Sequence, residues 1–507
     1  MTVTLDGKTL TIEDVVRVSR RYERIELRES AREKITKSRE VLDELIKSRI
    51  IYGINTGFGA LSNTTIPPED IEKLQLNLIR SHSTGIGPAL PTDVTRAMML
   101  LRANTLAKGL SGIRLPTLET LVAMINSRVH PIIPERGSVG ASGDLAPLAH
   151  LALTLIGEGC AEYQGKVVNS SEALKAASIS PVQLAAKEGL ALINGTQMMT
   201  AIGALMVHDA KNLIDYAERS GAVSLEVLEG LVEAFDDRLH QARPHPGQTA
   251  SARHMMQLLH GSKLVSSGEE RVLKGLHRQD PYSLRCIPQV MGAVRDSVEH
   301  ASSVIEIELN SANDNPLIFS DDRVVLSGGN FHGQPIAIVL DLMCIALTTV
   351  GNLVERRINR LLDQKLSLGL PPFLVSATGR PGLSSGLMTT QCSAAALASE
   401  NKILSHPASV DSIPTSADFE DFVSMGPAAA LKLMRVVENV RFIVAIELIC
   451  ASQAVETRGA ENLSSANRST HMAVRRLVQR LEADREVSGD INRLAFALRE
   501  GDFVRAS

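Results

Sequence analysis

The sequence has little that would suit a nucleic acid, a membrane surface or a disulfide framework. Its 53 Lys and Arg residues against 57 Asp and Glu residues give a formal net charge of -4. Polyanionic partners usually require a basic patch, so this balance gives no reason to expect nucleic acid or a membrane. The five cysteines are widely spaced, with no C-x-x-C pair, which predicts reduced and mostly buried thiols instead of a zinc site or a redox dithiol. A small metabolite is the partner that this composition favours.

Targeting and membrane signals are also missing. The opening segment MTVTLDGKTLTIEDVV has no basic stretch followed by an apolar core, so we expect no signal peptide. In the C-terminal half, we expect the stretch RFIVAIELICASQAVE to be the most apolar, and Glu447 breaks it well before the roughly 20 apolar residues that a membrane span needs. We therefore expect a soluble protein of the cytoplasm.

Motifs for metal and nucleotide chemistry are absent as well. The 13 histidines form no H-E-x-x-H motif, and His245, His332 and His406 fall in separate loops, where hydrogen bonding is the expected role. The segment GSVGASGDLAPLAH at 137–150 lacks the Lys-Ser/Thr ending of a phosphate loop and the G-x-G-x-x-G spacing. Within it, Ser142 lies in Gly-Ala-Ser-Gly and not in the G-x-S-x-G of a serine hydrolase. The sequence thus predicts no metal and no nucleotide cofactor.

The pattern of apolar residues predicts a mainly α protein. With 507 residues, 44% of them hydrophobic, the chain can bury a large core, most naturally as two or more packed units. The opening TVTLDGKTL predicts a short strand that turns at Asp6-Gly7, followed by a helix that starts at Thr11 with Asp14 in a capping box. Strand signals are scarce after this point. The stretch PTDVTRAMMLLRANTLAKGLSG predicts a helix with Thr92 or Asp93 as its cap.

Two long segments, 335–363 and 427–456, are apolar over more than one face. Such helices suit the centre of a bundle, packed on several neighbours within the chain or on other subunits. We expect a smaller, mixed N-terminal part over residues 1–200 and a helical bundle over 201–507. Polar loops are expected at RCIPQ, NSANDNP, SGGNFHGQP and PASVDSIPTSADFEDFVSMG, and loops between rigid helices are where a site is expected.

The segment 137–150 has a purely structural interpretation. Asp144 would be the N-cap of a helix that begins near Leu145, with Pro147 in its first turn. An Ala-Ser-Gly triplet alone carries little information, since these residues are common.

Seen with the rest of the chain, the same segment resembles the signature of the aromatic amino-acid ammonia-lyase family. The resemblance covers nearly the whole chain, and within the family it is greatest to members that act on histidine. The further stretches that carry it are YGINTGFG at 52, LQLNLIRSH at 74, KEGLALINGTQ at 187, DPYSLRCIPQVMGA at 280, NSANDNPLIF at 310, SGGNFHGQP at 327 and SENKILSHPASVDSIPTSA at 399.

The resemblance implies that Ala141, Ser142 and Gly143 cyclise and lose water to give 4-methylidene-imidazol-5-one, an electrophile made from the backbone. The residue types suit this chemistry, because the Gly143 nitrogen must swing back onto the Ala141 carbonyl. Ser142 supplies the hydroxyl that leaves. No ordinary side chain is a strong electrophile, so the group would act as a built-in cofactor.

Tyr52 matches the catalytic base of the family, which removes the β-proton of the substrate. A tyrosine has an ordinary pKa of about 10, so it needs positive charge or hydrogen bonds that favour the phenolate. The chain has only five tyrosines, and Gly53, Gly57 and Gly59 flank this one, although a core-packing role is the alternative.

Arg285 matches the residue that pairs with the substrate carboxylate, a bidentate task that suits guanidinium. The alternative is a structural bridge at a subunit contact. Tyr282, one helical turn earlier, and Asn194 correspond to positions around the electrophile and the substrate amine. Gln279 and Phe331 are weaker pocket candidates, for which packing is an equal alternative.

Two positions bear on the choice of substrate. His82 matches a histidine that addresses the substrate ring, although relatives that act on tyrosine can carry one there too. Glu420 falls where members acting on histidine have glutamate, and a carboxylate can accept a hydrogen bond from an imidazole N–H. Phe419 and Phe422 depart from the family pattern, which has polar residues in this segment, and could alter the substrate or the activity.

The resemblance further implies a mainly α, fumarase-like architecture and a homotetramer in which loops of three subunits form each site. The reaction expected is the deamination of L-histidine to trans-urocanate and ammonia, the first step of histidine degradation. Alternatives are a lyase or 2,3-aminomutase of the same family that acts on tyrosine or phenylalanine, and a helical scaffold whose site is inactive.

Overall fold

The computed structural model describes residues 2–273, 277–376, 379–501 and 503. The chain divides into two compact units, each made of several segments. Unit 1 comprises Met1–His208, Ala301–Asp341 and Pro407–Leu431. Unit 2 comprises Asp209–His300, Leu342–His406 and Lys432–Ser507. The first boundary falls near the one predicted at residue 200, whereas the return of later segments to unit 1 was not predicted; the two domains themselves stay a prediction.

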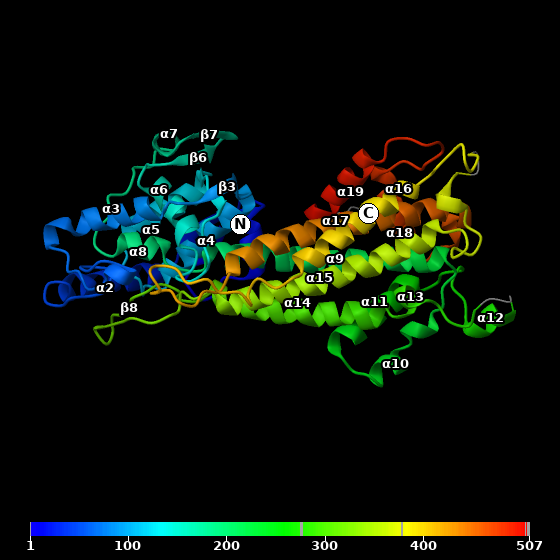
Figure 1. The fold of residues 1–507 in the computed structure, drawn as a ribbon, viewed down its shortest axis with the longest axis horizontal. Coiled ribbons are helices and arrows are strands. Elements are labelled where there is room, and N and C mark those ends of the chain that lie inside the picture. Colours follow the sequence, from blue (N-terminus) through cyan, green and yellow to red (C-terminus); the bar gives the residue numbers. More distant parts are fainter. Residues whose placement is uncertain (1, 274–276, 377–378, 502, 504–507) are drawn as a thin grey trace. The chain divides into compact units, whose positions relative to one another are not determined.

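Unit 1 combines helices with short strands (Figure 1). The helices that lie wholly in it are α1 (Ile12–Ser19), α2 (Glu29–Leu45), α3 (Ile71–His82), α4 (Thr92–Ala107), α5 (Leu115–Asn126), α6 (Leu145–Leu155), α7 (Ser170–Ala176) and α8 (Glu188–Ile193). Its strands are β1 (Thr2–Leu5), β2 (Arg24–Leu27), β3 (Ile86–Ala89), β4 (His130–Pro131), β5 (Pro134–Arg136), β6 (Cys160–Tyr163), β7 (Lys166–Asn169), β8 (Leu317–Phe319) and β9 (Val324–Leu326). They form small sheets in the orders β1-β2, β3-β5, β4-β6-β7 and β8-β9.

The start of the chain confirms the predicted cap but not the predicted turn. Thr11 and Asp14 form the capping box of α1, with each side chain accepting from the other residue's backbone N–H. β1 pairs in parallel with β2, so the turn at Asp6-Gly7 does not close a hairpin. The Asp6 carboxylate instead accepts from the backbone N–H groups of Lys8 and Thr9, which leads the chain into α1.

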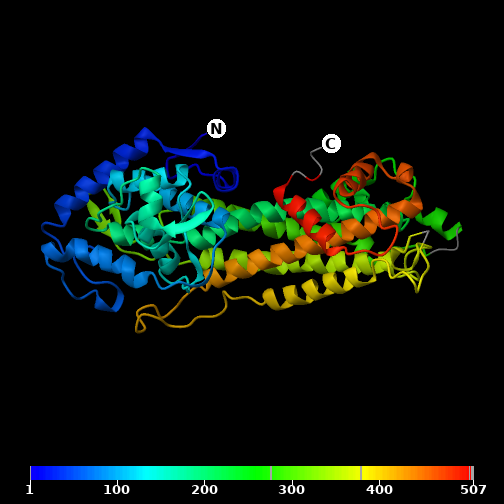
Figure 2. The same cartoon turned by 90° about the horizontal axis from the view of Figure 1, so that it is seen from above.

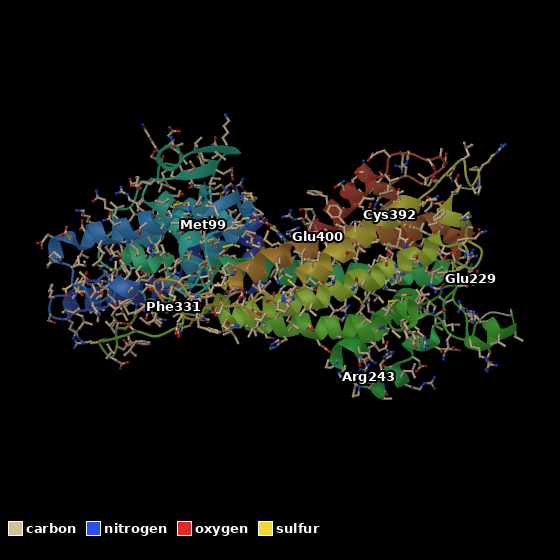
Figure 3. All side chains as sticks on the ribbon, viewed as in Figure 1. Met99, Glu229, Arg243, Phe331, Cys392 and Glu400 are labelled. Carbon is tan, nitrogen blue, oxygen red and sulfur yellow. The ribbon has the colours of Figure 1, made fainter. Side chains whose placement is uncertain are left out.

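Helix α4 forms the interior of unit 1. Every residue from Val94 to Ala107 is buried, including Met99 (Figure 3). Its N-cap is Pro91 without a side-chain hydrogen bond, so the predicted cap at Thr92 or Asp93 is wrong. Thr92 and Asp93 are instead the first two residues of the helix, and the burial of the residues that follow stabilises it.

Four long helices contribute residues to both units. They are α9 (Gln197–Val227), α14 (Ile287–Leu309), α15 (Gln334–Leu362) and α17 (Gly426–Arg458), and the last two confirm the predicted long helices. Within unit 2 the four run side by side (Figures 1 and 2). Glu447 of α17 is fully buried there and pairs with Arg357 of α15 at 2.6 Å. Interior packing on several neighbours accounts for apolar residues on all faces of these helices.

The remaining helices of unit 2 are short or peripheral to those four. They are α10 (Asp237–Gln241), α11 (Pro246–Leu259), α12 (Gly268–Leu273), α13 (Tyr282–Arg285), α16 (Met388–Leu404), α18 (Ser465–Leu477) and α19 (Ser488–Glu500). Single 3₁₀ turns occur at Gly59–Leu61, Pro68–Asp70, Glu233–Phe235, Pro372–Leu374 and Ala460–Asn462.

One helix within the described ranges, α15, is long and apolar enough to cross a membrane, and 67% of its most apolar window is buried inside the protein. The most apolar stretch of the C-terminal half is therefore in α15 and not around Glu447, which corrects that prediction. A buried bundle helix has this composition because it contacts other helices all round.

All five cysteines are free, but most of them are not buried, which corrects that prediction. Cys344 and Cys450 are buried, whereas Cys160 and Cys392 are exposed. Figure 3 labels Cys392. Cys160 lies on β6 and Cys392 lies on α16.

The predicted loops are present with one difference. Residues 310–316, 327–333 and 407–425 connect helices or strands without helical structure, and all three belong to unit 1. The segment RCIPQ is instead almost wholly helical, because only Cys286 separates α13 from α14. The three confirmed loops and the N-terminal residues of unit 1 together form the candidate site.

Candidate functional site

A cavity of about 1020 Å³ lies within unit 1. Its wall comes from the loop after α2, from α3, from the start of α6, from the end of α8 and from the loops that precede α15 and α17. Seven residues that the sequence analysis proposed for the site line it: Tyr52, His82, Ala141, Ser142, Asn194, Phe331 and Glu420. Segments far apart in the sequence thus meet at one cavity.

Four proposed residues do not line this cavity. One is Gly143, which follows the cavity-lining Ser142 in unit 1, and the others are Gln279, Tyr282 and Arg285, which belong to unit 2. Gln279 is exposed, and Tyr282 is 70% exposed on the single turn of α13. The Arg285 guanidinium lies over the Tyr282 ring at 4.6 Å and donates to the Asp280 carbonyl at 2.9 Å. The predicted one-turn spacing is therefore confirmed, while the role of these residues stays a prediction.

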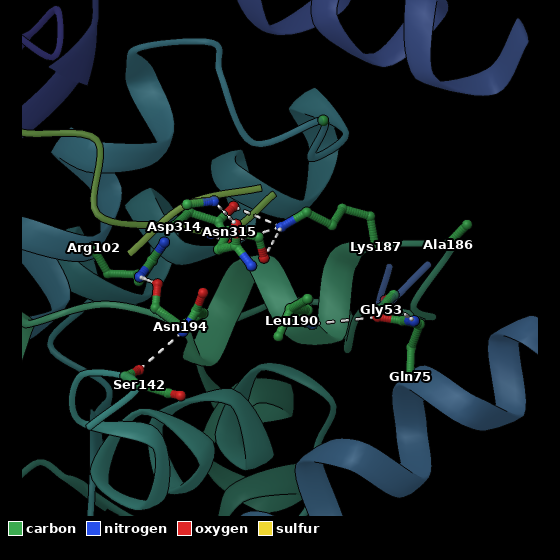
Figure 4. A network of polar contacts seen from close by, with 12 residues as sticks. Gly53, Gln75, Arg102, Ser142, Ala186, Lys187, Leu190, Asn194, Asp314 and Asn315 are labelled. Atoms are coloured by element: carbon green, nitrogen blue, oxygen red, sulfur yellow. Dashed lines mark hydrogen bonds and ion pairs between the residues drawn. The ribbon is translucent and has the colours of Figure 1, made fainter. Parts of the chain in front are cut away.

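The Ala-Ser-Gly segment lies in a crowded turn that requires glycine. Gly143 has φ of +74°, and a Cβ there would lie 2.1 Å from the Gly195 carbonyl oxygen. The Asp144 backbone N–H donates to that same oxygen at 2.7 Å. The Asn194 side-chain amide donates to the Ser142 carbonyl at 2.9 Å, and Ser138 Oγ donates to the Gly143 carbonyl at 3.0 Å (Figure 4). The backbone of the triplet is thus held on both sides.

Asp144 occupies the N-cap of α6, which begins at Leu145 as predicted, but its side chain makes no bond to that helix. Its Oδ2 accepts from the backbone N–H groups of Met198 at 2.7 Å and Met199 at 3.2 Å, in the first turn of α9. Burial raises the pKa of Asp144 to about 7. The triplet is therefore fixed at the starts of two helices, whose N-terminal ends carry partial positive charge.

A buried cation supports Asn194 from behind. Arg102 of α4 is fully buried and donates to the Asn194 carbonyl at 2.8 Å and to Gln197 Oε1 at 2.9 Å (Figure 4). Burial lowers the pKa of Arg102 to about 10, so it stays charged at neutral pH. Nearby, Lys187 and Asp314 form a fully buried ion pair at 2.8 Å. The sequence did not single out Arg102, although two arginines, Arg96 and Arg102, within the apolar run of α4 were a visible signal.

Tyr52 lies partly buried at the cavity wall. Its phenol oxygen accepts a hydrogen bond from the backbone N–H of Gly59 at 3.2 Å. The loop between them is closed by Thr56, whose hydroxyl accepts from the Gly53 N–H at 2.9 Å. The phenol oxygen of Tyr52 is thus fixed in position at the cavity wall by a backbone donor.

Glu420 is held against Ser142 by a tight turn. Its carboxylate accepts from Ser142 Oγ at 2.6 Å and, through the other oxygen, from Thr415 Oγ1 at 2.6 Å. Thr415 and Glu420 also pair through their backbones. Between them Ser416, Ala417 and Asp418 have φ of 52°, 53° and 65°. Such conformations cost about 1–3 kcal/mol each outside glycine and persist only where the surroundings impose them.

His82 ends α3 and faces the cavity with a neutral ring. Its Nδ1 donates to the Leu78 carbonyl at 2.9 Å, which leaves Nε2 as an acceptor. Burial lowers the pKa of His82, while the Leu78 carbonyl and the charge of Glu420 oppose this shift.

The outer wall of the cavity is aromatic. Phe419 and Phe422 line it while remaining 58% and 61% exposed. The Phe422 ring stacks on His332 with centroids 6.0 Å apart, and His332 Nε2 donates to the Phe422 carbonyl at 3.2 Å. The hydrogen-bonding role predicted for His332 is confirmed. Phe331 lies on the neighbouring loop (Figure 3).

Metal ligation has no cluster to support it in the part of the chain that the structure describes. No group of three or more His, Cys, Asp or Glu side chains there is arranged to hold a metal ion.

Comparison with known proteins gives matches over nearly the whole chain. The sequence matches the aromatic amino acid lyase family over residues 10–476. It is 52% identical to the histidine ammonia-lyase of Caldanaerobacter subterraneus subsp. tengcongensis over 501 residues, which are 98% of this chain and 97% of that protein. Tyrosine aminomutase from Streptomyces globisporus has a similar structure, with a TM-score of 0.96 and 43% identity over 100% of this chain and 98% of that one. Histidine ammonia-lyase from Trypanosoma cruzi matches with a TM-score of 0.91 and 42% identity, over 100% and 94% of the two chains. Both structural matches include the whole cavity.

Proposed function

Because the chain belongs to the aromatic amino acid lyase family, we propose that it releases ammonia from L-histidine and forms trans-urocanate, the first step of histidine degradation. The observation that carries this proposal is the carboxylate of Glu420, which lines the cavity and acts electrostatically on His82. A carboxylate can accept a hydrogen bond from an imidazole N–H and stabilise its cation, whereas a phenyl ring would leave the carboxylate unpaired. The neutral His82 ring adds an acceptor at Nε2.

The same family premise supports a prosthetic group made from Ala141, Ser142 and Gly143, namely 4-methylidene-imidazol-5-one. The turn fits this group, because the crowding at Gly143 admits no side chain and Asn194 holds the Ser142 carbonyl. Once formed, the group supplies an electrophile that activates the amino acid for loss of ammonia. We propose no metal and no nucleotide.

Tyr52 is the proposed base for the β-proton of the substrate. Its oxygen receives the proton, and the Gly59 N–H holds that oxygen in position. The phenylalanine side chains at the outer wall, Phe331, Phe419 and Phe422, exclude water from the ring of the bound amino acid.

Arg285, Tyr282 and Gln279 are proposed to complete the site from another copy of the chain in a homotetramer. Tyr282 is a large side chain left 70% exposed, and none of the three lines the cavity of unit 1. An arginine held by an aromatic ring is well suited to bidentate recognition of a substrate carboxylate. We place this homotetramer in the cytoplasm.

The experiment is a substrate panel with purified protein. Urocanate formation from L-histidine, followed by its absorbance, is expected, and Ser142→Ala is expected to abolish it. Turnover of tyrosine or phenylalanine in place of histidine would overturn the substrate assignment. An intact mass without the loss of about 36 Da expected for two waters would favour an inactive scaffold.

A second candidate is an enzyme of the same family that acts on tyrosine or phenylalanine, as a lyase or as an aminomutase. It is favoured by the apolar Phe419 at the cavity and by the 43% identity to a tyrosine aminomutase. Chromatography of the products separates the outcomes, because an aminomutase yields a β-amino acid. Phe419→Gln is expected to shift the ratio of histidine to phenylalanine turnover toward histidine by about tenfold, as changes in pocket polarity do.

A further inference from the structure

The geometry points to Glu420 as the group that moves the proton in the dehydration of Ser142, so that this residue acts once on the chain itself before it serves any substrate. The inference rests on the proposed formation of the prosthetic group from Ala141, Ser142 and Gly143. It assigns to Glu420 a role in maturation that is separate from recognition of the substrate.

The contact that carries the inference joins Glu420 to the one atom of Ser142 that must leave. Ser142 Oγ donates to Glu420 Oε1 at 2.6 Å, a length typical of a hydroxyl bonded to a carboxylate. Both residues line the cavity and are partly buried. In the matured chain this hydroxyl is gone, so the carboxylate is then free to face the cavity. Glu420 Oε1 can therefore take part first in the dehydration of Ser142 and later in binding the substrate.

The surroundings hold the carboxylate in place for this task. Glu420 Oε2 accepts from Thr415 Oγ1, and the backbones of the two residues pair across a turn of three left-handed residues. A turn of this kind fixes the direction of the side chain at its end. Glu420 is thus aimed at Ser142 by contacts that do not involve any substrate.

The two losses of water balance without any outside reagent. In the first, the Gly143 nitrogen bonds to the Ala141 carbonyl carbon, and that oxygen leaves with the hydrogens of the Gly143 and Ser142 amides. In the second, Glu420 takes the proton from Ser142 Cα and returns it to Ser142 Oγ. The Cβ–Oγ bond breaks, a Cα=Cβ bond forms, water leaves, and the carboxylate is regenerated.

Asn194 assists the second step from the other side of the residue. Its amide donates to the Ser142 carbonyl, which is bonded directly to Cα. Negative charge that develops at Cα spreads onto this carbonyl oxygen, where a fixed donor stabilises it. Glu420 on the hydroxyl and Asn194 on the carbonyl therefore lie on the two groups that the dehydration changes.

In the test, the full-length chain is synthesised in a cell-free system, as the wild type and as Glu420→Gln, and samples are digested at successive times. Peptides that span Ala141–Gly143 are weighed at successive times, so that losses of about 18 and about 36 Da are distinguished. The wild type is expected to lose both waters. In Glu420→Gln the second water is expected to leave at least 100-fold more slowly, since general acid–base groups contribute 10²- to 10⁴-fold.

Matched variants separate the chemistry from effects on folding. Asp418→Asn removes a negative charge from the same turn at a left-handed position that asparagine tolerates, and it is expected to mature at the wild-type rate. Thr415→Val keeps Glu420 but removes its anchor, so it is expected to slow only the second loss, and Thr415→Ser is expected to restore it. If Glu420→Gln does not fold, as judged by circular dichroism, Thr415→Val and Thr415→Ser carry the test.

Equal rates of the second loss in the wild type, Glu420→Gln and Thr415→Val would overturn the inference while leaving the proposed function intact. A wild-type chain that loses no water would instead overturn the proposed prosthetic group itself.

Discussion

Glu447 and Arg357 form a buried ion pair in unit 2, and its loss is expected to lower the free energy of unfolding. Replacing Glu447 by Gln keeps the size of the side chain but removes its charge. The carboxylate accepts from Arg357 Nε at 2.6 Å and Nη2 at 2.8 Å, and from Ser220 at 2.6 Å and Ser224 at 2.8 Å. Both members of the pair have no exposed side-chain surface. The substitution therefore leaves a buried guanidinium without its counter-charge.

The magnitude follows from this burial. Breaking a buried pair by changing one partner costs about 3–5 kcal/mol of unfolding free energy, because the remaining charge is uncompensated. Since about 1.4 kcal/mol corresponds to a factor of ten, unfolding should accelerate by roughly 10²- to 10⁴-fold if the pair is broken in the transition state. Replacing both partners by Met should recover most of this loss, since apolar side chains of similar volume often substitute without penalty.

The assay is the rate of unfolding in urea, followed by circular dichroism at fixed protein concentration. Glu438→Gln is the matched control, because this exposed residue lies on the same helix α17. The reasoning is refuted if Glu447→Gln unfolds within a factor of two or so of that control. It is also refuted if the double Met variant unfolds as fast as Glu447→Gln.

Three further predictions concern the site. Gly143→Ala should block maturation, because its Cβ would meet the Gly195 carbonyl at 2.1 Å, and the intact mass should show no loss of water. Tyr52→Phe should lower kcat by about 10²- to 10⁴-fold while the mature mass is unchanged, since it removes the base that the Gly59 N–H supports; an unmatured chain would contradict this. Asp144 has a folded-state pKa raised to about 7 from 3.8, so its contribution to stability is present below pH 3.8 and is lost as pH rises toward 7. In Asp144→Asn, denaturation across pH 4 to 7 should show a flatter dependence on pH, and an unchanged dependence would contradict the assignment.

Much of the fold could be predicted from the sequence where the pattern was long and regular. The helices at 335–363 and 427–456 and the capping box of Thr11 follow from local periodicity and local hydrogen bonding, which the chain encodes over a few residues. Errors occurred where tertiary packing replaced a local preference. Thr92 and Asp93 do not cap α4, because the helix already begins at Thr92, and Asp6-Gly7 closes no hairpin, because β1 pairs in parallel with β2.

The candidate site divides in the same way. The chemical types, a triplet able to cyclise, a tyrosine and a glutamate, were visible as sequence stretches, and the cavity brings Tyr52, Ser142 and Glu420 together. The supporting residues were not visible. Arg102 behind Asn194 and the carboxylate of Asp144 bonded to another helix are contacts across long separations in sequence, which no local pattern encodes.

The sequence by itself determined a mainly helical chain with the residues of a lyase, because composition, periodicity and short motifs depend on neighbours along the chain. Only the tertiary structure decided which of those residues share a cavity, and that the Ser142 hydroxyl meets the Glu420 carboxylate. That contact joins residues far apart in sequence, and its geometry is set by a turn strained at Ser416–Asp418 and by the crowding at Gly143. Distances of this kind arise from the whole folded chain, which is why they cannot be read from any stretch of it.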